Sequence, residues 1–231
     1  MKNINLVCGT RYSSEEFFSK TMLGRCLHYY CRLYRINMMI FPNGNSSLPV
    51  IFNKAIDIYK DSDSVIVFMH DDIGFMSFYW PEVLMESLAK FDVVGLVGNH
   101  RRLPRQPAWA FKDDSFAWDD AENFCGAIGH GKEFPSYISY FGQSMDHFNR
   151  ECKLIDGALI AISSETLKRS GLRFDERFNH HLYDVDLCRQ AEELGLTIGV
   201  TPISALHESG GTFGTLDWRA GYQTYLEKWG E

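Results

Sequence analysis

Three short tracts contain residue types that could carry out chemistry, and the first is His70, Asp71 and Asp72. Two neighbouring carboxylates repel each other and lose hydration when they are buried, so they require a cation or another partner. The tract therefore predicts a divalent metal ion, of the kind that holds a diphosphate group. A structural alternative stays open, in which Asp72 caps a turn and His70 is an ordinary surface histidine.

The second tract, residues 183–186, has the sequence Tyr-Asp-Val-Asp and follows His180 and His181, while the third is His207 alone. Acids beside two histidines are typical of an acid–base site. The helix dipole also favours acids in the first turn of any helix, whatever their function. His207 precedes two glycines that could let the chain fold over a ligand, although a lone histidine is more often structural.

The stretch that positions the first tract is the most apolar in the chain. Five consecutive apolar residues, 65–69, lie between a turn-like acidic segment and His70. A strand can dispense with alternating polarity only when both faces are buried, so residues 64–72 predict the central strand of a sheet. Ligands bind at the carboxyl ends of strands in open α/β sheets, which makes this end the predicted active site.

Predicted strands and helices alternate over the first hundred residues. Such alternation favours parallel strands joined by right-handed crossovers, and hence a doubly wound, nucleotide-binding half at residues 1–99. The predicted strands are 4–8, 36–41, 64–72 and 93–97, and the predicted helices are 17–34, 47–59 and 81–91.

The second half, residues 100–231, is expected to belong to the same single domain, because 231 residues suit one large α/β domain. Residues 100–150 have no clear periodicity, and long irregular stretches tend to be functional loops or lids. Aromatic residues in 109–141 and in the last helix predict core or oligomer packing, with sugar stacking or membrane docking as the alternative. Further elements are predicted at 153–162, 164–170, from 183, at 197–200, 204–206 and 217–229.

Composition excludes several classes of protein. The formal net charge of −7 argues against nucleic-acid binding, which needs a basic face. No apolar run is long enough to span a membrane, and the N-terminus does not resemble a signal peptide, so we expect a cytoplasmic protein. The absence of G-x-G-x-x-G, P-loop, G-x-S-x-G and H-E-x-x-H motifs argues against dehydrogenases, ATPases, serine hydrolases and zincins.

The cysteines are scattered along the sequence and form no C-x-x-C pair. This spacing is unlike a secreted disulfide framework or a zinc motif. We therefore expect reduced thiols that are mostly buried and inert. The six residues are Cys8, Cys26, Cys31, Cys125, Cys152 and Cys188.

Taken together, the motifs resemble those of a known enzyme family. The succession comprises a strand ending in Gly-Thr, the acidic end of the 64–72 strand, Asp-Gly-Ala at 156–158, Phe-Asp-Glu-Arg-Phe at 174–178, Asp-Val-Asp-Leu-Cys at 184–188 and the late His207. It is similar to GT-A glycosyltransferases of the family 2 type, and within them to the branch of the streptomycin-cluster StrF proteins. The resemblance covers most of the chain and implies an α/β, GT-A (nucleotide-diphospho-sugar transferase) fold with a mainly parallel central sheet flanked by helices.

The resemblance also assigns roles to individual residues. The family's D-x-D motif and late histidine imply that His70, Asp72 and His207 hold a divalent metal, Mn²⁺ or Mg²⁺. The acid that deprotonates the acceptor corresponds to Asp184. The implied donor-binding residues are Thr10, Arg11, Asn43, Asn53 and Asp71, and the implied substrate-binding residues are Asp156, Gly157 and Asp186.

The chain departs from the family pattern at three positions. His70 replaces the first acid of D-x-D, which makes the metal site softer and less anionic. Tyr183 replaces the usual glutamate before the catalytic aspartate, and Phe52 stands where many relatives carry arginine.

The resulting hypothesis is an inverting glycosyltransferase of polysaccharide biosynthesis. It would move a sugar from a nucleotide-sugar donor to a hydroxyl of a glycan or lipid-linked acceptor, with residues 1–99 as the nucleotide-binding half and 100–231 as the acceptor-side half. Peripheral contact with the inner face of the membrane and oligomerisation stay open. The alternatives are a non-catalytic module that binds nucleotide sugars or glycans, and a metal-dependent phosphohydrolase that uses His70, Asp72 and His207.

Overall fold

A computed structural model of the chain describes residues 2–30, 34, 36–132, 134–142 and 145–230. Strand β3 (Ser64–His70) lies inside the first of two sheets, whose order is β11-β5-β10-β3-β1-β2. Every residue of β3 except His70 is buried, because β1 and β10 pair with its two edges and helices cover the sheet. The predicted central strand is therefore confirmed.

The first sheet is mainly parallel. Strand β1 (Asn3–Gly9) is parallel to β2 (Ile36–Phe41) and to β3, and β11 (Ile198–Val200) is parallel to β5 (Val93–Gly95). Only β10 (Leu159–Ser163) runs antiparallel to its neighbours, β3 and β5. Because β1, β2 and β3 are parallel, their carboxyl ends meet at one edge of the sheet.

Helices flank this sheet. Helices α3 (Leu48–Tyr59) and α5 (Ser164–Ser170) contact each other and pack on β3, and α4 (Trp80–Leu88) packs on β5 and β10. The other helices are α1 (Ser14–Lys20), α2 (Met22–Tyr30), α6 (Tyr183–Glu193) and α7 (Leu216–Trp229). No helix among the described residues has the length and apolar character needed to cross a membrane.

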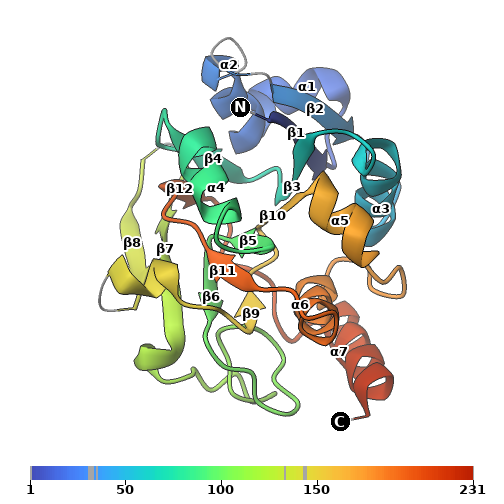
Figure 1. Cartoon of the computed structure of the whole chain (residues 1–231), viewed down its shortest axis with the longest axis vertical. Helices are drawn as coiled ribbons and strands as arrows, with labels where there is room; N and C mark the ends of the chain where they lie inside the picture. Colours follow the sequence, from blue (N-terminus) through green and yellow to red (C-terminus); the bar gives the residue numbers. More distant parts are fainter. Residues whose placement is uncertain (1, 31–33, 35, 133, 143–144, 231) are drawn as a thin grey trace.

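The second sheet contains most of the regular structure that sequence periodicity did not predict. Its order is β4-β12-β7-β6-β9, with β8 paired to β7, and Figure 1 shows β7 and β8 on the side of the molecule away from α3 and α7. The segment 100–150 supplies the hairpin of β7 and β8. The bounds are β4 Ile73–Phe75, β6 Val97–Asn99, β7 Phe124–His130, β8 Tyr137–Phe141, β9 Leu154–Ile155 and β12 Ala205–His207, with 3₁₀ turns at Ala121–Asn123 and Met145–Asn149.

Three predicted elements are each divided in the structure, and the strand predicted at 153–162 forms β9 in the second sheet and β10 in the first. The predicted helix 17–34 breaks at Thr21, whose hydroxyl donates to the Phe17 carbonyl at 2.8 Å and accepts from the Gly24 amide at 2.9 Å. That capping separates α1 from α2, and residues 31–33 of the prediction lie outside the described residues, as does Cys31. The predicted strand 93–97 is also divided, because the chain leaves the first sheet after β5 and enters the second as β6.

Four aromatic side chains join the first sheet to the segment that precedes α6. The ring of Phe52, on α3, lies 5.0 Å from those of Phe68 and Phe174 and 6.0 Å from that of Tyr183. Phe52 and Phe68 are fully buried. Phe52, one of the three departures from the family pattern, is thus part of the hydrophobic core in this chain.

Asn53 is tied to the same segment. Its amide donates to the Phe174 carbonyl at 2.8 Å and to the Glu176 carboxylate at 2.9 Å, and its oxygen accepts from the Phe174 amide at 3.0 Å. The side chain is buried, with an exposed fraction of 4%. The amide therefore fastens the 174–176 segment to α3.

Replacing Asn53 with alanine is expected to lower the free energy of unfolding by about 3 kcal/mol, because the buried Phe174 amide and carbonyl lose their partners. Urea unfolding measures this loss. Lys54→Ala, at the exposed neighbouring position, should change the same quantity by no more than about 0.5 kcal/mol. Equal stability of the two variants would show that the amide does not fasten the segment.

Candidate active site

His70, Asp72 and His207 meet where β3 and β12 end. The Asp72 Oδ2 atom lies 3.4 Å from His207 Nε2, and Asp72 Oδ1 lies 4.0 Å from His70 Nδ1. One ligand atom from each residue lies within 4.8 Å of the other two. Asp72 Oδ1 is buried and has no hydrogen-bond partner among the described residues. An unpartnered buried carboxylate oxygen facing two imidazoles fits a divalent cation.

Electrostatics in this cluster keep the carboxylate charged. Burial raises the pKa of Asp72, but the hydrogen bond and charge of His207 outweigh that effect and hold the pKa below its ordinary value. Burial alone would lower the pKa of His207, but Asp72 raises it overall. Burial lowers the pKa of His70, so its imidazole is neutral at neutral pH.

Tyr183 fixes the orientation of the His70 ring. The Tyr183 hydroxyl donates to the Gly157 carbonyl at 2.9 Å and lies 2.8 Å from His70 Nε2. Since the hydroxyl has a single proton, Nε2 must carry the proton that joins the ring to the hydroxyl oxygen. The lone pair of the neutral imidazole is then on Nδ1, the ring atom that faces Asp72.

Replacing Tyr183 with phenylalanine is expected to weaken Mn²⁺ binding about tenfold, because the His70 ring loses the contact that sets its tautomer. Isothermal titration with Mn²⁺ gives the dissociation constant. Tyr59→Phe, which removes a hydroxyl from α3, serves as the matched control and should leave the constant unchanged. Unaltered Mn²⁺ binding in a folded Tyr183→Phe protein would contradict the orienting role.

Asp184 lies at the start of α6, after Leu182, whose φ of 63° places it in the left-handed region. One carboxylate oxygen accepts from the Gly157 amide at 2.9 Å and the other accepts from the Val185 amide at 3.0 Å. Burial, followed by the charge of Asp156, raises the pKa of Asp184 to about 7. A carboxylate with that pKa is suited to accept a proton near neutral pH.

This raised pKa predicts how stability depends on pH. The folded protein binds the Asp184 proton more tightly than the unfolded chain, whose carboxyl has an ordinary pKa of 3.8, so the ionised carboxylate destabilises the fold as pH rises. The metal-free protein should therefore lose about 3 kcal/mol of stability relative to Asp184→Asn between pH 5 and pH 8, with no further relative loss at higher pH. Urea unfolding of both proteins at several pH values measures the difference. A constant difference would mean that the pKa is not raised.

The loop between β9 and β10 forms the cavity wall beside Asp184. A Cβ atom on Gly157 would lie 2.5 Å from the Tyr183 hydroxyl oxygen, so only glycine fits there. Asp156 accepts from the Trp109 indole at 2.6 Å and from the Ala158 amide at 2.8 Å. The segment 100–150 thus contributes Trp109 to the site.

A single cavity of about 190 Å³ joins these groups. His70, His207 and Asp184 all line it, although His70 lies more than one hundred positions before the other two in the sequence. The three tracts singled out in the sequence therefore surround one hollow. The other lining residues are Pro107, Ala108, Trp109, Asp156, Gly157, His180, His181, Leu182, Tyr183, Val185, Ser209, Gly211, Thr212, Phe213 and Trp218.

A second cavity, of about 420 Å³, lies at the carboxyl ends of β1 and β2. Thr10, Arg11 and Asp71 line it, and the Thr10 hydroxyl donates to the Asp71 carboxylate at 2.6 Å. Asn43 has a φ of 65° and lies in the turn that borders this cavity, although it is not among the lining residues. His180 lines both this cavity and the 190 Å³ cavity, which shows that the two adjoin.

Comparison with known proteins connects this geometry to a family. The model of the Glycosyltransferase like family matches residues 28–210, a span that includes β3, Asp184 and His207. The chain belongs to the glycosyltransferase-like family. A search of curated proteins found no match.

The solved structure of GalNAc-T7 supports the fold of this glycosyltransferase-like chain. GalNAc-T7, in a structure with UDP, GalNAc and Mn²⁺, superposes with a TM-score of 0.56 at 10% identity over 98% of this chain and 48% of that one. TarS 1–349 from S. aureus has a TM-score of 0.47 at 13% identity over 89% and 60%. A197 from STIV superposes with a TM-score of 0.48 at 13% identity over 90% of this chain and 86% of that one. The chain thus spans about half of GalNAc-T7, and it has the expected GT-A fold.

Two residues assigned from the family resemblance lie elsewhere in the structure. Asn53 is buried between α3 and Phe174 and lines none of the described cavities. Asp186 is fully buried and faces α7, where it pairs with Lys228 at 2.6 Å and accepts from the Trp229 indole at 2.9 Å. Both side chains hold elements together rather than lining a cavity of the candidate site.

Sequence reasoning gave no individual role to two residues that the site contains. Trp109 was only one of several aromatic residues in an unassigned segment, and its indole reaches Asp156 from a distant part of the chain. His180 was noted beside Asp184, but its position between two cavities depends on the loop that precedes α6. No local spacing in the sequence indicates either contact.

Proposed function

We propose that this member of the glycosyltransferase-like family is an inverting enzyme that transfers a sugar from a nucleotide-sugar donor to a hydroxyl group of a glycan or lipid-linked acceptor. The observation that carries the proposal is the single cavity lined by His70, His207 and Asp184. It combines a cluster suited to a cation with a carboxylate suited to act as a base. Within the family, we propose a place in the branch of StrF-like proteins of polysaccharide biosynthesis.

The donor would occupy the two adjoining cavities. The nucleoside fits the 420 Å³ cavity beside Thr10, Arg11 and Asp71, with the Asn43 turn at its border. Its diphosphate would then extend toward His70 and His207. This placement corresponds to a division of one domain into a nucleotide-binding half, 1–99, and an acceptor-side half, 100–231.

His70, Asp72 and His207 would hold the divalent ion, which neutralises charge that develops on the leaving diphosphate. Asp184 would remove the proton from the acceptor hydroxyl as that oxygen attacks the anomeric carbon. Attack from the face opposite the leaving group inverts the anomeric centre. Asp156 and Gly157 would border the donor sugar and the acceptor, since they form the cavity wall beside Asp184.

A thermal-shift screen followed by a transfer assay tests this proposal. UDP, GDP, CDP and dTDP are each added with and without Mn²⁺, and UDP comes first because the GalNAc-T7 structure holds UDP and Mn²⁺. A ligand at one hundred times its dissociation constant adds about 2.7 kcal/mol of stability, which raises Tm by several degrees. The matching nucleotide sugars then serve as donors. The absence of any Mn²⁺-dependent shift among the four nucleotides would count against the proposal.

A second candidate is a non-catalytic module that binds a nucleotide sugar. Two departures from the family pattern favour it: His70 and Tyr183 stand where the family resemblance implies acids, and the two side chains are hydrogen-bonded to each other. Calorimetric binding of a nucleoside diphosphate without transfer or hydrolysis across a donor panel would support this candidate. Release of phosphate from simple esters would instead indicate a metal-dependent phosphohydrolase.

A further inference from the structure

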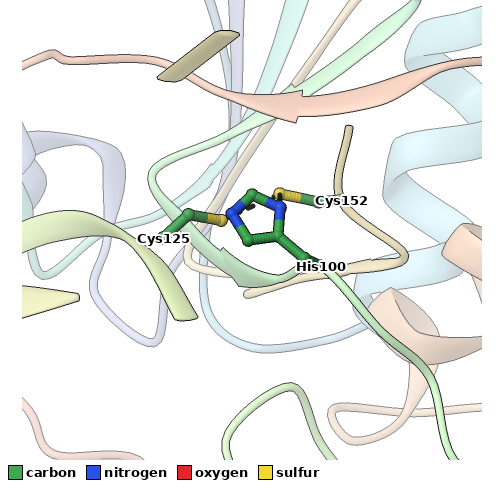
Figure 2. A group of neighbouring side chains, drawn as sticks. All are labelled: His100, Cys125 and Cys152. Atoms are coloured by element: carbon green, nitrogen blue, oxygen red, sulfur yellow. Dashed lines mark hydrogen bonds between the residues drawn. The ribbon is translucent and has the colours of Figure 1, made fainter. Parts of the chain in front are cut away.

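A second group of metal-binding side chains lies outside the catalytic cavity. His100 follows β6, Cys125 belongs to β7 and Cys152 precedes β9, so all three come from the second sheet and its connections. Figure 2 shows the two cysteine side chains approaching the His100 ring from opposite sides. No pairwise spacing in the sequence marks these residues as a group, because 25 and 27 positions separate them.

The three side chains are close enough to bind the same metal ion. The two sulfur atoms lie 2.9 Å apart, and Cys152 Sγ lies 3.9 Å from His100 Nδ1. One nitrogen of His100 and both sulfurs all lie within 4.8 Å of one another. Cys125 is fully buried and Cys152 is 2% exposed, while His100 is partly exposed at the edge of the group.

We propose that His100, Cys125 and Cys152 bind a zinc ion. Two thiolates and an imidazole are a ligand set that Zn²⁺ prefers, with water at the fourth position. Tetrahedral zinc with sulfur ligands at about 2.3 Å places those sulfurs about 3.7 Å apart, so Cys125 and Cys152 need to separate by only about 1 Å. The ion displaces the thiol protons when it binds.

The surroundings of the histidine support this role. His100 Nδ1 lies 2.8 Å from the Glu151 carbonyl oxygen, and a carbonyl can only accept, so Nδ1 carries a proton. Histidines that bind metal commonly donate one ring N–H to a backbone carbonyl in this way, and Nε2 would then be the atom that binds the ion.

A zinc ion accounts for all three side chains. A disulfide between Cys125 and Cys152 would involve only the two sulfurs, and both sulfurs are shielded from an oxidant in solution. Because His100 begins the irregular segment and Cys152 follows it, an ion between them would close the base of the 100–150 segment. That segment carries Trp109, whose indole binds Asp156 in the catalytic cavity. The site would thus stabilise the wall that faces the substrates.

Cobalt substitution and zinc analysis test the proposal on the whole chain. Protein purified under reducing conditions with Zn²⁺ should retain about one zinc per chain that EDTA removes slowly, and Co²⁺ in its place should give sulfur-to-cobalt charge-transfer bands in the near ultraviolet. Cys125→Ala and Cys152→Ala should abolish these bands, and His100→Ala should weaken them. The rise in Tm that zinc gives should also be smaller in each variant than in the unaltered protein.

Two controls separate this site from the catalytic cluster. Asp72→Ala should keep the charge-transfer bands, since His70, Asp72 and His207 contain no sulfur. Cys26→Ser, which alters a thiol on α2 outside the group, should keep both the bands and the bound zinc. Folded wild-type protein without the bands would overturn the proposal. A mass two hydrogens lower, from a disulfide that excludes metal, would overturn it as well.

Discussion

Replacing Asp184 with asparagine is expected to reduce the rate of glycosyl transfer roughly 10³-fold, because general-base catalysis contributes on that order. Asparagine has nearly the same shape, and its one side-chain oxygen keeps one of the two hydrogen bonds from backbone amides, so the start of α6 should keep its position. It cannot accept a proton from the acceptor hydroxyl at any pH near neutrality. The measurement is the initial transfer rate at saturating donor and Mn²⁺, with the donor found in the thermal-shift screen.

Asp186→Asn is the matched control, two residues further along the same helix. Asp186 pairs with Lys228 and Trp229 in the core, so its replacement should lower stability without changing the rate per folded molecule. Asp184→Asn should lower the rate per folded molecule and, at pH 8, raise stability, because it removes a buried charge. Wild-type transfer by folded Asp184→Asn protein would rule out this residue as the base.

The contrast between these two aspartates shows how far sequence reasoning reaches. The pattern of the tract and its resemblance to a family predict an acidic helix start, but they do not say which carboxylate faces a cavity. That depends on the partner of each side chain. Lys228 lies more than forty residues away, in a helix whose packing against α6 has no local signal. The inward direction of the Asn53 side chain was unpredictable for the same reason, since its partners are at 174 and 176.

The fold was predictable where one physical constraint dominates. A short, unbroken apolar run that ends at polar residues favours a doubly buried strand, so β3 and the position of His70 at its end were predictable from the sequence. The β7–β8 hairpin was not predictable, because β8 is largely exposed and has no regular alternation of burial. Its strands are defined by pairing with each other and by β12 and β6, which are contacts of the second sheet.

The cysteines illustrate a different limit. Their scattered positions correctly indicate free thiols at the described positions, and Cys8, Cys125, Cys152 and Cys188 are buried. Local spacing could not show that Cys125 and Cys152 meet, because β7 and the chain before β9 approach each other across β6. The sequence therefore predicts inert thiols, and the zinc proposal depends on tertiary contacts that only the structure shows.

Replacing Asp72 with alanine is the second change with a large expected effect, a loss of transfer of roughly 10³-fold together with loss of the response to Mn²⁺. A bound divalent ion contributes several kcal/mol of charge stabilisation to such a reaction. Asp72 is the only carboxylate of the cluster, and its Oδ1 atom is buried without a protein partner. Without it, two neutral imidazoles would have to hold the cation in a partly buried site, which is a much weaker ligand set for Mn²⁺.

Transfer rates measured across a Mn²⁺ titration, with EDTA as the zero point, check this expectation. Wild-type protein in EDTA and Asp72→Ala at any Mn²⁺ concentration should give similar low rates, because both lack the same ion. Asp63→Ala, at the exposed position just before β3, should keep the wild-type titration curve. If Asp72→Ala retained a Mn²⁺-stimulated rate, the cation would have to bind elsewhere, and His70 and His207 would act on the diphosphate directly.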